Sequence, residues 1–303
     1  MIKKVLIIIT VITGFIIVGT AGYSYFLYNS IAETVASIHE PMERNFQTSK
    51  RSIEVSIEKN DPLSFLLLGV DAINLENGRS DTIIIITVNP NTNSMLMLSL
   101  PRDTRTNIAG KGFDDKVNHA YAFGGAKMAV ETVENFLDIP IDHFISVNMD
   151  SFKEIVDALG GVTVENPFEF YDGGYHFQSG AIHLDGHAAL TYSRMRYKDP
   201  RGDHGRNDRQ RQIIAAMINE GVQLSTLAKV TKILNSIETN VRTDLTFDQM
   251  KKIHANYKAV ISNQETLTIN GSGKIINGIW YYLVSDEEKN RLSVALKKHL
   301  EIE

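Results

Sequence analysis

Residues 62–100 read PLSFLLLGVDAINLENGRSDTIIIITVNPNTNSMLMLSL. Three short runs in this stretch, 62–70, 81–88 and 94–100, are rich in Ile, Val, Leu and Met and do not alternate with polar residues. Such runs are typical of strands that are covered on both faces. Because the turn sequence NPNTN (89–93) separates the second run from the third, these two runs are predicted to form a hairpin.

The sequence beyond this stretch carries helical and strand patterns in turn. Helices are predicted over 117–138, 150–161, 207–227, 246–262 and 286–300, and strands over 143–149, 265–269 and 279–284. Helices mixed with covered strands indicate a three-layer α/β/α domain. We assign residues 62–303 to this one domain of the α/β class.

The N-terminus carries an uncharged run from Val5 to Ala32, preceded by Lys3 and Lys4. The run exceeds the roughly 20 residues that cross a bilayer and the apolar core of a cleavable signal peptide. We therefore expect a cytoplasmic stub (1–4), a transmembrane anchor (5–28) and an extracellular stalk (29–61). Lysines before an anchor stay in the cytoplasm, so the chain is predicted to be a single-pass membrane protein of type II, with its domain outside the cell.

Composition narrows the possible functions. The chain has 303 residues, no cysteine and a formal net charge of -5, so disulfides and thiolate metal sites are excluded and nucleic acid is not an expected partner.

The stretch YSRMRYKDPRGDHGRNDRQRQ (192–212) departs from this balance with six arginines and one lysine. A local excess of one sign fits either a solvated face or an anion site. The histidines are too dispersed for a zinc set.

The helix that follows this basic stretch has a stripe that is apolar for two turns and polar at its N-terminal end: Arg206, Gln210, Ile213, Ile214 and Met217. Its polar members are predicted to point inward, where a buried arginine needs an anion. The free amides of a helix N-terminus also favour phosphate. An ion pair of Arg206 with Asp203 is an equally good interpretation from sequence. Arg211, on the opposite side of the helix, is predicted to be solvated.

Arg194 and Arg196 lie two residues apart, so in an extended chain they would project to the same side. Two planar guanidinium groups on one side suit a phosphate or a pyrophosphate. Single-stranded nucleic acid could use the same groups. The predicted extracellular position and the scarcity of stacking aromatics argue against it.

Charged residues also follow or precede the three apolar runs. Asp71 ends the first run, Arg79 and Asp81 precede the second, and Arg102 follows the third. Adjacent strand ends would bring these four side chains to one edge of the sheet, where open α/β folds form ligand crevices. Carboxylates at such an edge can share a magnesium ion, which also takes substrate phosphate oxygens as ligands.

Six segments, in this order, resemble the LytR-CpsA-Psr family of cell-wall enzymes. They lie between Phe65 and Gln212 and read LLLGVD, GRSDT, SLPRDT, KVNHAYAFGG, DGHAALTYSRMR and DHGRNDRQRQ. The resemblance implies a central mixed sheet with an apolar tunnel for a prenyl chain. It also implies a phosphotransferase that moves an anionic glycopolymer, such as wall teichoic acid, from a polyprenyl-pyrophosphate carrier to the C6 hydroxyl of muramic acid in peptidoglycan.

The resemblance assigns roles to particular residues. Asp71 and Asp81 correspond to the carboxylates associated with Mg²⁺, and Asp71 is also the proposed proton acceptor. Asp203 is implied to orient Arg206, and Lys116 to help hold the lipid headgroup. Asp71, Asp81, Arg102 and Arg206 form the implied catalytic set. The implied pyrophosphate cradle comprises Arg79, Arg102, Arg194, Arg196, Arg206 and Gln210.

Two positions depart from the family pattern. Many members have an arginine shortly after the first aspartate, where this chain has Ala72, Ile73 and Asn74. His204 replaces a residue that is usually apolar, which leaves a pH-sensitive cradle and a solvent-facing histidine as alternatives. Two other functions also remain open from sequence: a pyrophosphatase acting on the same lipid carriers, and a non-catalytic regulator that binds lipid pyrophosphate.

Overall fold

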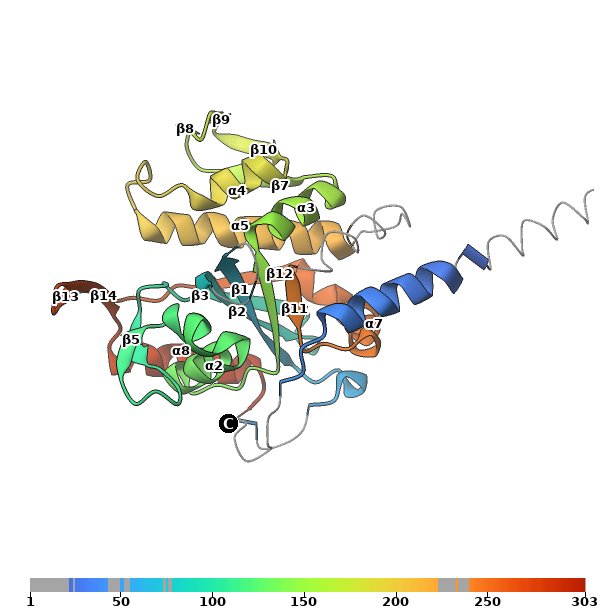
Figure 1. Cartoon of the computed structure of the whole chain (residues 1–303), viewed down its shortest axis with the longest axis horizontal. Coiled ribbons are helices and arrows are strands. Elements are labelled where there is room, and N and C mark those ends of the chain that lie inside the picture. Colours follow the sequence, from blue (N-terminus) through green and yellow to red (C-terminus); the bar gives the residue numbers. More distant parts are fainter. Residues whose placement is uncertain are drawn as a thin grey trace, which may run out of the picture.

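A computed structural model describes residues 22–23, 25–42, 50–51, 55–72, 75, 78–222, 233 and 240–302. Its centre is a six-stranded mixed sheet in the order β11-β6-β1-β2-β3-β12 (Figure 1). The strands are β1 (Leu63–Asp71), β2 (Arg79–Asn89), β3 (Ser94–Ser99), β6 (His143–Asn148), β11 (Val241–Thr243) and β12 (Asn263–Leu267). The predicted α/β class with a central mixed sheet is confirmed.

The middle of the sheet is built by the three apolar runs. β2 pairs antiparallel with both β1 and β3, and the predicted hairpin over 89–93 connects β2 to β3. β1 also pairs in parallel with β6, and β3 in parallel with β12, which makes the sheet mixed. The antiparallel β1–β2–β3 arrangement places the end of β1, the start of β2 and the end of β3 at one edge of the sheet.

Helices cover both faces of the sheet (Figure 1). On one face α2 (His119–Leu137) and α8 (Asp286–His299) enclose a large hydrophobic core with β1, β2 and β3. The other face is covered by α5 (Asp203–Val222), α7 (Phe247–Asn256) and the 3-10 helix η2 (Lys258–Ser262). Helices α3 (Met149–Leu159) and α4 (Gly186–Arg194) pack on α5 in a further core.

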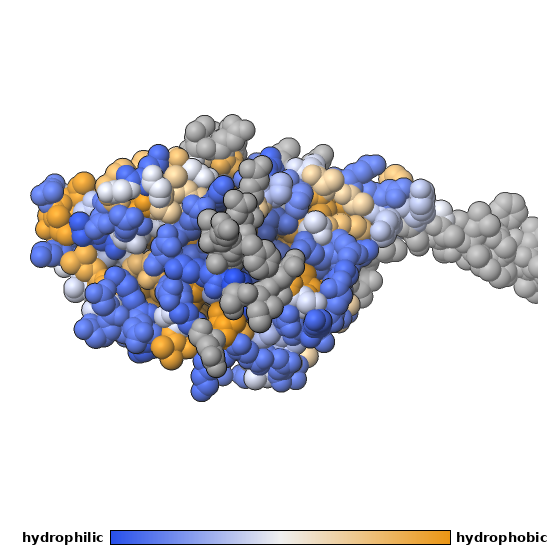
Figure 2. Space-filling view, turned by 90° about the horizontal axis from the view of Figure 1, so that it is seen from below, coloured by the Kyte–Doolittle hydropathy of each residue, from blue (hydrophilic) through white to orange (hydrophobic). Residues whose placement is uncertain are grey.

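Four two-stranded hairpins and ribbons complete the domain. They are β4–β5 (Arg105–Asn107 and Asp114–Lys116), β7–β10 (Val162–Asn166 and Gly180–Leu184), β8–β9 (Phe170–Asp172 and Tyr175–Phe177) and β13–β14 (Ser272–Ile276 and Ile279–Leu283). The β13–β14 hairpin projects from one end of the molecule (Figure 1), and Figure 2 shows hydrophobic residues gathered at that end of an otherwise mostly hydrophilic face.

Helix boundaries follow from local capping. Helix α3 begins earlier than predicted because the side chain of Asn148 accepts a hydrogen bond from the amide of Ser151, and it ends at Gly160, whose φ of 93° suits glycine. Helix α2 is interrupted at Gly124 and Gly125. The predicted helix 246–262 is in fact two elements, α7 and η2. The predicted helix 207–227 begins at Asp203, and its last residues, 223–227, lie outside the described residues.

The described N-terminal residues contact the domain. Residues 25–38 are helical, and Val35 and Ile38 are buried. His39 forms a parallel bridge with Thr243 at the edge of the sheet. Within the part of the chain that the structure describes, no helix is both long and apolar enough to span a membrane. Most of the predicted anchor (5–28) lies outside that part, so the anchor and the stub, stalk and domain boundaries stay predictions.

Candidate active site

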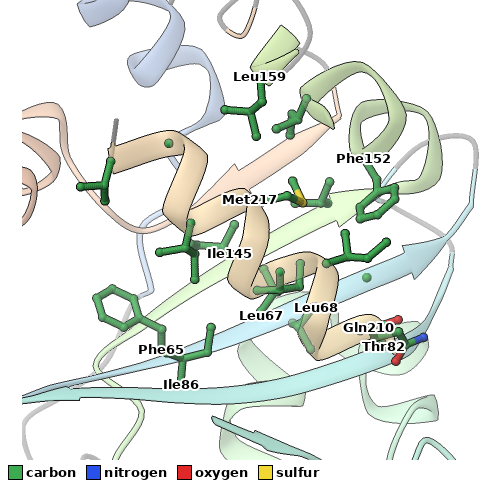
Figure 3. Close-up of a pocket in the computed structure, with 18 of the residues that line it drawn as sticks. Phe65, Leu67, Leu68, Thr82, Ile86, Ile145, Phe152, Leu159, Gln210 and Met217 are labelled. Carbon is green, nitrogen blue, oxygen red and sulfur yellow. The ribbon is translucent and has the colours of Figure 1, made fainter. Parts of the chain in front are cut away.

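An apolar cavity of about 590 Å³ lies between the sheet and helices α3, α5 and α7. Figure 3 shows Leu67 and Ile145 from the sheet, Phe152 from α3 and Met217 from α5 projecting into this space. Its walls become polar at one end, where Thr82, Arg194 and Gln210 line it. The stripe predicted on α5 is therefore correct from Gln210 onward, because Gln210, Ile213, Ile214 and Met217 all line the cavity.

The strand ends meet at this polar end, as predicted. Asp71 and Arg79 are direct partners in the β1–β2 register, and Arg79 is exposed. Arg102, which follows β3, donates a hydrogen bond from Nη1 to Oδ2 of Asp81 over 2.6 Å. Burial opposes the charge of Arg102, but the carboxylates of Asp81 and Asp103 raise the pKa of its guanidinium above the ordinary value.

Arg194 and Arg196 both lie beside carboxylates of the site, but not on an extended segment as predicted. Arg194 is the last residue of α4 and Met195 caps the helix. The two arginines therefore do not lie on one extended segment. Arg194 Nη2 nevertheless lies 3.0 Å from Oδ1 of Asp71, and Arg196 Nε lies 3.5 Å from Oδ1 of Asp203. The structure therefore brings both arginines beside site carboxylates while correcting the predicted geometry.

Arg206 is the most buried cation of the site. Its side chain is 8% exposed, and Nη2 lies 2.7 Å from Oδ1 of Asp203. The two groups are not aligned for a hydrogen bond, so Nε and Nη2 of Arg206 are buried without hydrogen-bond partners among the described residues. Burial, followed by the charges of Arg102 and Arg196, lowers the pKa of Arg206. The contact with Asp203 that the sequence allowed is present, yet it leaves donors free for another anion.

We refer to Arg102, Arg196 and Arg206 as the arginine cluster. Lys116 extends the positive charge on the side of β5, where its Nζ lies 2.6 Å from Oδ1 of Asp103. Clustered cations repel one another, and a buried, unused donor is unfavourable. A phosphate or pyrophosphate group would relieve both conditions, because its oxygens can accept from several guanidinium groups at once.

Asn118 is a site residue that the sequence analysis missed. Its side-chain amide donates to Oδ1 of Asp81 over 3.0 Å, while its own Oδ1 is buried and has no hydrogen-bond partner among the described residues. Its place in the segment KVNHAYAFGG, next to Val117 and Lys116, was the available signal. The asparagine adds an oxygen donor beside the carboxylate of Asp81.

Two further arginines of α5 have structural roles. Arg209 is 1% exposed and donates to Asp199, which is fully buried, and to the carbonyls of Tyr192 and Met195. It fixes the loop that carries Arg196 onto the helix. The prediction that Arg211 is solvated was wrong: the residue is 9% exposed, pairs with Asp208, and has its pKa lowered by burial.

His204 faces solvent, as one of the two sequence interpretations has it. Its ring is exposed at the start of α5 and meets the ring of Tyr282 edge-on at 6.1 Å. The segment after Asp71 departs from the family pattern. Its first residue, Ala72, is half-buried, and the next two, Ile73 and Asn74, lie outside the described residues.

These features define a class of site: an arginine-rich anion site at the polar end of an apolar cavity in an α/β domain, suited to an amphiphile with an anionic head. The model of the LytR_cpsA_psr family matches residues 25–298, and this chain belongs to that family. It is 51% identical over 302 residues, covering 99% of each chain, to a protein of Halalkalibacterium halodurans named polyisoprenyl-teichoic acid–peptidoglycan teichoic acid transferase TagU.

Solved structures agree with this assignment. Bacillus subtilis TagU is 46% identical with a TM-score of 0.68, and the match covers 80% of this chain and 98% of that one. TagT bound to LI-WTA is 29% identical with a TM-score of 0.74, and the match covers 87% of this chain and 100% of that one. The family predicted from the six sequence segments is therefore confirmed.

Proposed function

We propose that the protein is a phosphotransferase that moves an anionic cell-wall glycopolymer, such as wall teichoic acid, from a polyprenyl-pyrophosphate carrier to the C6 hydroxyl of muramic acid in peptidoglycan. The names of its relatives, which are teichoic acid–peptidoglycan transferases, support the reaction class. The observation that carries the proposal is the buried Arg206, whose Nε has no hydrogen-bond partner among the described residues and which lies one helical turn from Gln210 at the polar end of the apolar cavity.

The two parts of the site match the two parts of the proposed donor. A prenyl chain is wholly apolar, and the cavity that would hold it is lined by Leu, Ile, Met and Phe side chains from β1, β6, α3 and α5. The pyrophosphate would lie at the arginine cluster, where its oxygens accept from Arg102, Arg196 and Arg206. Arg79, Arg194, Gln210 and Lys116 complete the proposed cradle.

The proposed reaction needs stabilisation of charge more than a strong base. The acceptor oxygen attacks the phosphorus that carries the polymer, the bond to the carrier phosphate breaks, and negative charge grows on the phosphoryl oxygens and on the leaving phosphate. Fixed guanidinium groups in a site shielded from water stabilise that charge. We assign the proton of the acceptor hydroxyl to Asp71, whose carboxylate is half-exposed and so within reach of an incoming sugar.

Magnesium is part of the proposal, and the donors present fit it. Among the described residues no group of three or more His, Asp or Glu side chains could hold a metal alone. Mg²⁺, however, binds through one or two carboxylates and completes its shell with water and substrate phosphate. Asp71 and Asp81 would supply the carboxylates, and the unpartnered Oδ1 of Asn118 beside Asp81 is a further oxygen donor. Bound Mg²⁺ would neutralise charge on the phosphoryl oxygens.

A transfer assay tests the proposal. The full chain in detergent micelles is mixed with a polyprenyl-pyrophosphate glycan labelled in its sugar and with uncrosslinked peptidoglycan, in the presence of Mg²⁺ or of a chelator. Label should appear in peptidoglycan, and chelation should reduce its rate of appearance by about 100-fold or more, as expected for loss of a major charge-stabilising group. Asp81→Asn should reduce the rate comparably while leaving the far-UV circular dichroism unchanged.

Other outcomes of this assay would favour the alternatives. Release of labelled sugar phosphate into solution, with none in peptidoglycan, would indicate a pyrophosphatase. Tight binding of the lipid without turnover would indicate a regulator. A rate that does not respond to chelation would remove Mg²⁺ from the proposal and leave the arginine cluster as the source of charge stabilisation.

The proposed reaction places the domain outside the cell, where peptidoglycan lies. We propose that residues 5–28 anchor the chain with the N-terminus in the cytoplasm, because the run from Val5 to Ala32 is uncharged and follows two lysines. In intact spheroplasts, external protease should degrade the domain. Protection of the domain until the membrane is permeabilised would contradict this topology.

A further inference from the structure

The β13–β14 hairpin exposes an apolar surface beside the site. Ile275, Ile279 and Trp280 are 68%, 47% and 41% exposed. The hairpin projects from the domain in Figure 1, and hydrophobic residues are visible at the same end in Figure 2. Large apolar side chains grouped on a projecting element indicate a contact surface for a ligand or partner.

The hairpin is tied directly to the segment that carries the arginine cluster. The amide of Tyr282 donates to the carbonyl of Asp103 over 2.9 Å, and Thr104 forms a bridge with Tyr282. Asp103 follows Arg102 in the chain, so the base of the hairpin is joined to the residue after a member of the arginine cluster.

One face of the hairpin is turned toward the start of α5. Side chains two apart in a strand share a face, so Trp280 and Tyr282 lie on the same side, about 7 Å apart along β14. The ring of Tyr282 contacts His204, two residues before Arg206. Trp280 therefore lies on the same face of β14 as Tyr282, the residue that meets the start of α5.

The indole of Trp280 is held in place by a glycine. A Cβ atom at Gly273 would come within 2.9 Å of the indole, so the ring lies against the bare backbone of β13. Trp280 is 41% exposed, so an aromatic surface stays open to solvent. Such an aromatic face is suited to the C–H face of a sugar ring, which is apolar while its edge is polar.

Charge selects among the possible sugar ligands. The hairpin 272–283 contains one basic residue, Lys274, and no acid. The first turn of α8, directly after the hairpin, carries Asp286, Glu287 and Glu288. Arg105 and Lys116 lie over Tyr281, which points to the other face of β14. The hairpin therefore offers one cation of its own to a polymer of repeated phosphates, whereas a glycan strand without phosphate needs none.

We propose that the Trp280 face of the β13–β14 hairpin docks the glycan strand of uncrosslinked peptidoglycan and so aligns the acceptor hydroxyl with the arginine cluster. This inference rests on the proposed function for the identity of the acceptor. The sugar packs its C–H face on the exposed indole, Gly273 leaves room for the ring against β13, and the strand runs toward the start of α5.

The single tryptophan of the chain gives a direct test of binding that needs no turnover. A soluble, uncrosslinked peptidoglycan tetrasaccharide is titrated into the full chain in detergent micelles while the indole fluorescence is recorded. A saturable change is expected for the wild type. By calorimetry, Trp280→Ala should weaken binding about tenfold, Trp280→Phe should weaken it less, and Gly273→Val should weaken it by displacing the ring.

Tyr171→Ala is the matched control, because Tyr171 is also an exposed aromatic on a two-stranded hairpin, β8–β9, and is 61% exposed. It should bind the tetrasaccharide as the wild type does. In the transfer assay, Trp280→Ala should raise the KM for the acceptor about tenfold and leave kcat and the KM for the lipid donor unchanged.

Three results would overturn the inference: no change of indole fluorescence on titration, equal binding by Trp280→Ala and wild type, or a rise in the KM for the lipid donor that matches the rise for the acceptor. Failure of the proposed function is distinguishable. If the wild type bound the tetrasaccharide through Trp280 but transferred nothing, the docking surface would stand and the transferase would not.

Discussion

The two faces of the central sheet differ although the same strands build both. Along β1, Leu66, Leu68 and Val70 are fully buried in a core that α2 and α8 close. Phe65 and Leu67, which alternate with them, point to the other face and line the cavity of about 590 Å³. We call these the packed face and the hollow face.

The difference lies in what covers each face. Protein interiors are normally close-packed, so a large apolar space that side chains leave unfilled indicates a ligand site. The packed face supplies the stability of the domain, and the hollow face keeps room for a substrate. Changes of similar size should therefore affect stability on one face and activity on the other.

The largest expected differences in transfer rate and in stability come from substituting two arginines that lie one turn apart on α5, Arg206 and Arg209. Arg206→Ala should reduce the transfer rate by about 10²–10³-fold, because it removes donors aimed at the proposed pyrophosphate. Its free energy of unfolding should fall less than that of Arg209→Ala, because the partner that Arg206 leaves, Asp203, is partly exposed and keeps Arg196 3.5 Å away. Transfer rates and urea unfolding curves measure the two quantities.

Arg209→Ala is the matched control. It removes the buried arginine from the fully buried carboxylate of Asp199 and leaves the half-exposed Arg201, 3.4 Å away, as a charged partner. It also removes the donors to the carbonyls of Tyr192 and Met195, so the free energy of unfolding should fall by about 3–5 kcal/mol. If Arg206→Ala were as destabilising as Arg209→Ala and kept its activity, Arg206 would be a structural residue and the site assignment would fail.

A smaller effect is expected from enlarging neighbouring side chains of β1. Leu67→Trp should fill part of the cavity and raise the KM for the lipid donor, with little effect on stability. Leu66→Trp should overpack the core and lower the free energy of unfolding by about 1–3 kcal/mol. Donor titrations and urea unfolding distinguish the two variants.

Equal destabilisation by these two variants would show that the hollow face is as tightly packed as the other. An unchanged KM for the donor in Leu67→Trp would exclude the cavity as the binding site of the prenyl chain.

The smallest expected effect is on the pH dependence of stability, and it comes from a histidine on the packed face. The two ring nitrogens of His299 are hydrogen-bonded with the hydroxyls of Thr87 (2.7 Å) and Ser94 (2.9 Å), one donating and the other accepting in the neutral ring. Burial lowers the pKa of His299 below the ordinary value near 6.5. The unfolded chain therefore binds a proton more readily. The stabilising contribution is complete above about pH 6.5 and is lost as the pH falls through the lower pKa of the folded state.

Unfolding midpoints in urea between pH 7.5 and pH 5 should fall less steeply in His299→Gln than in the wild type. His204→Gln, at an exposed position, should follow the wild-type curve. Parallel curves for His299→Gln and wild type would show that His299 does not contribute to the acid sensitivity.

Sequence patterns predicted most of the sheet and the residues of the site, because apolar runs and turns act locally. The central strands and the contact of Arg102 with Asp81 follow from three runs and one hairpin. Arg211 was predicted wrongly because its burial depends on the loop that packs over α5, which no helical stripe encodes. Asn118 was missed since its partner, Asp81, is 37 residues away in the sequence.

No strand was predicted over β13, because it is short and exposed and two of its five residues are serine and glycine. Its register against β14 sets Gly273 beneath the indole of Trp280, and such a fit between two strands depends on tertiary placement rather than on propensity.

The central place of β1 in the sheet has a consequence for dynamics. Its amides lie between β2 and β6, so they should exchange with deuterium only when the whole domain opens, whereas the three-residue edge strand β11 should exchange through local openings. Asp71 ends this slowest-exchanging strand. Arg194 and Arg196 lie outside the sheet, at the end of α4 and in the loop that follows it. Local openings of the edge strands should therefore leave the position of Asp71 unchanged, and Arg209 holds the loop that carries Arg196 on α5.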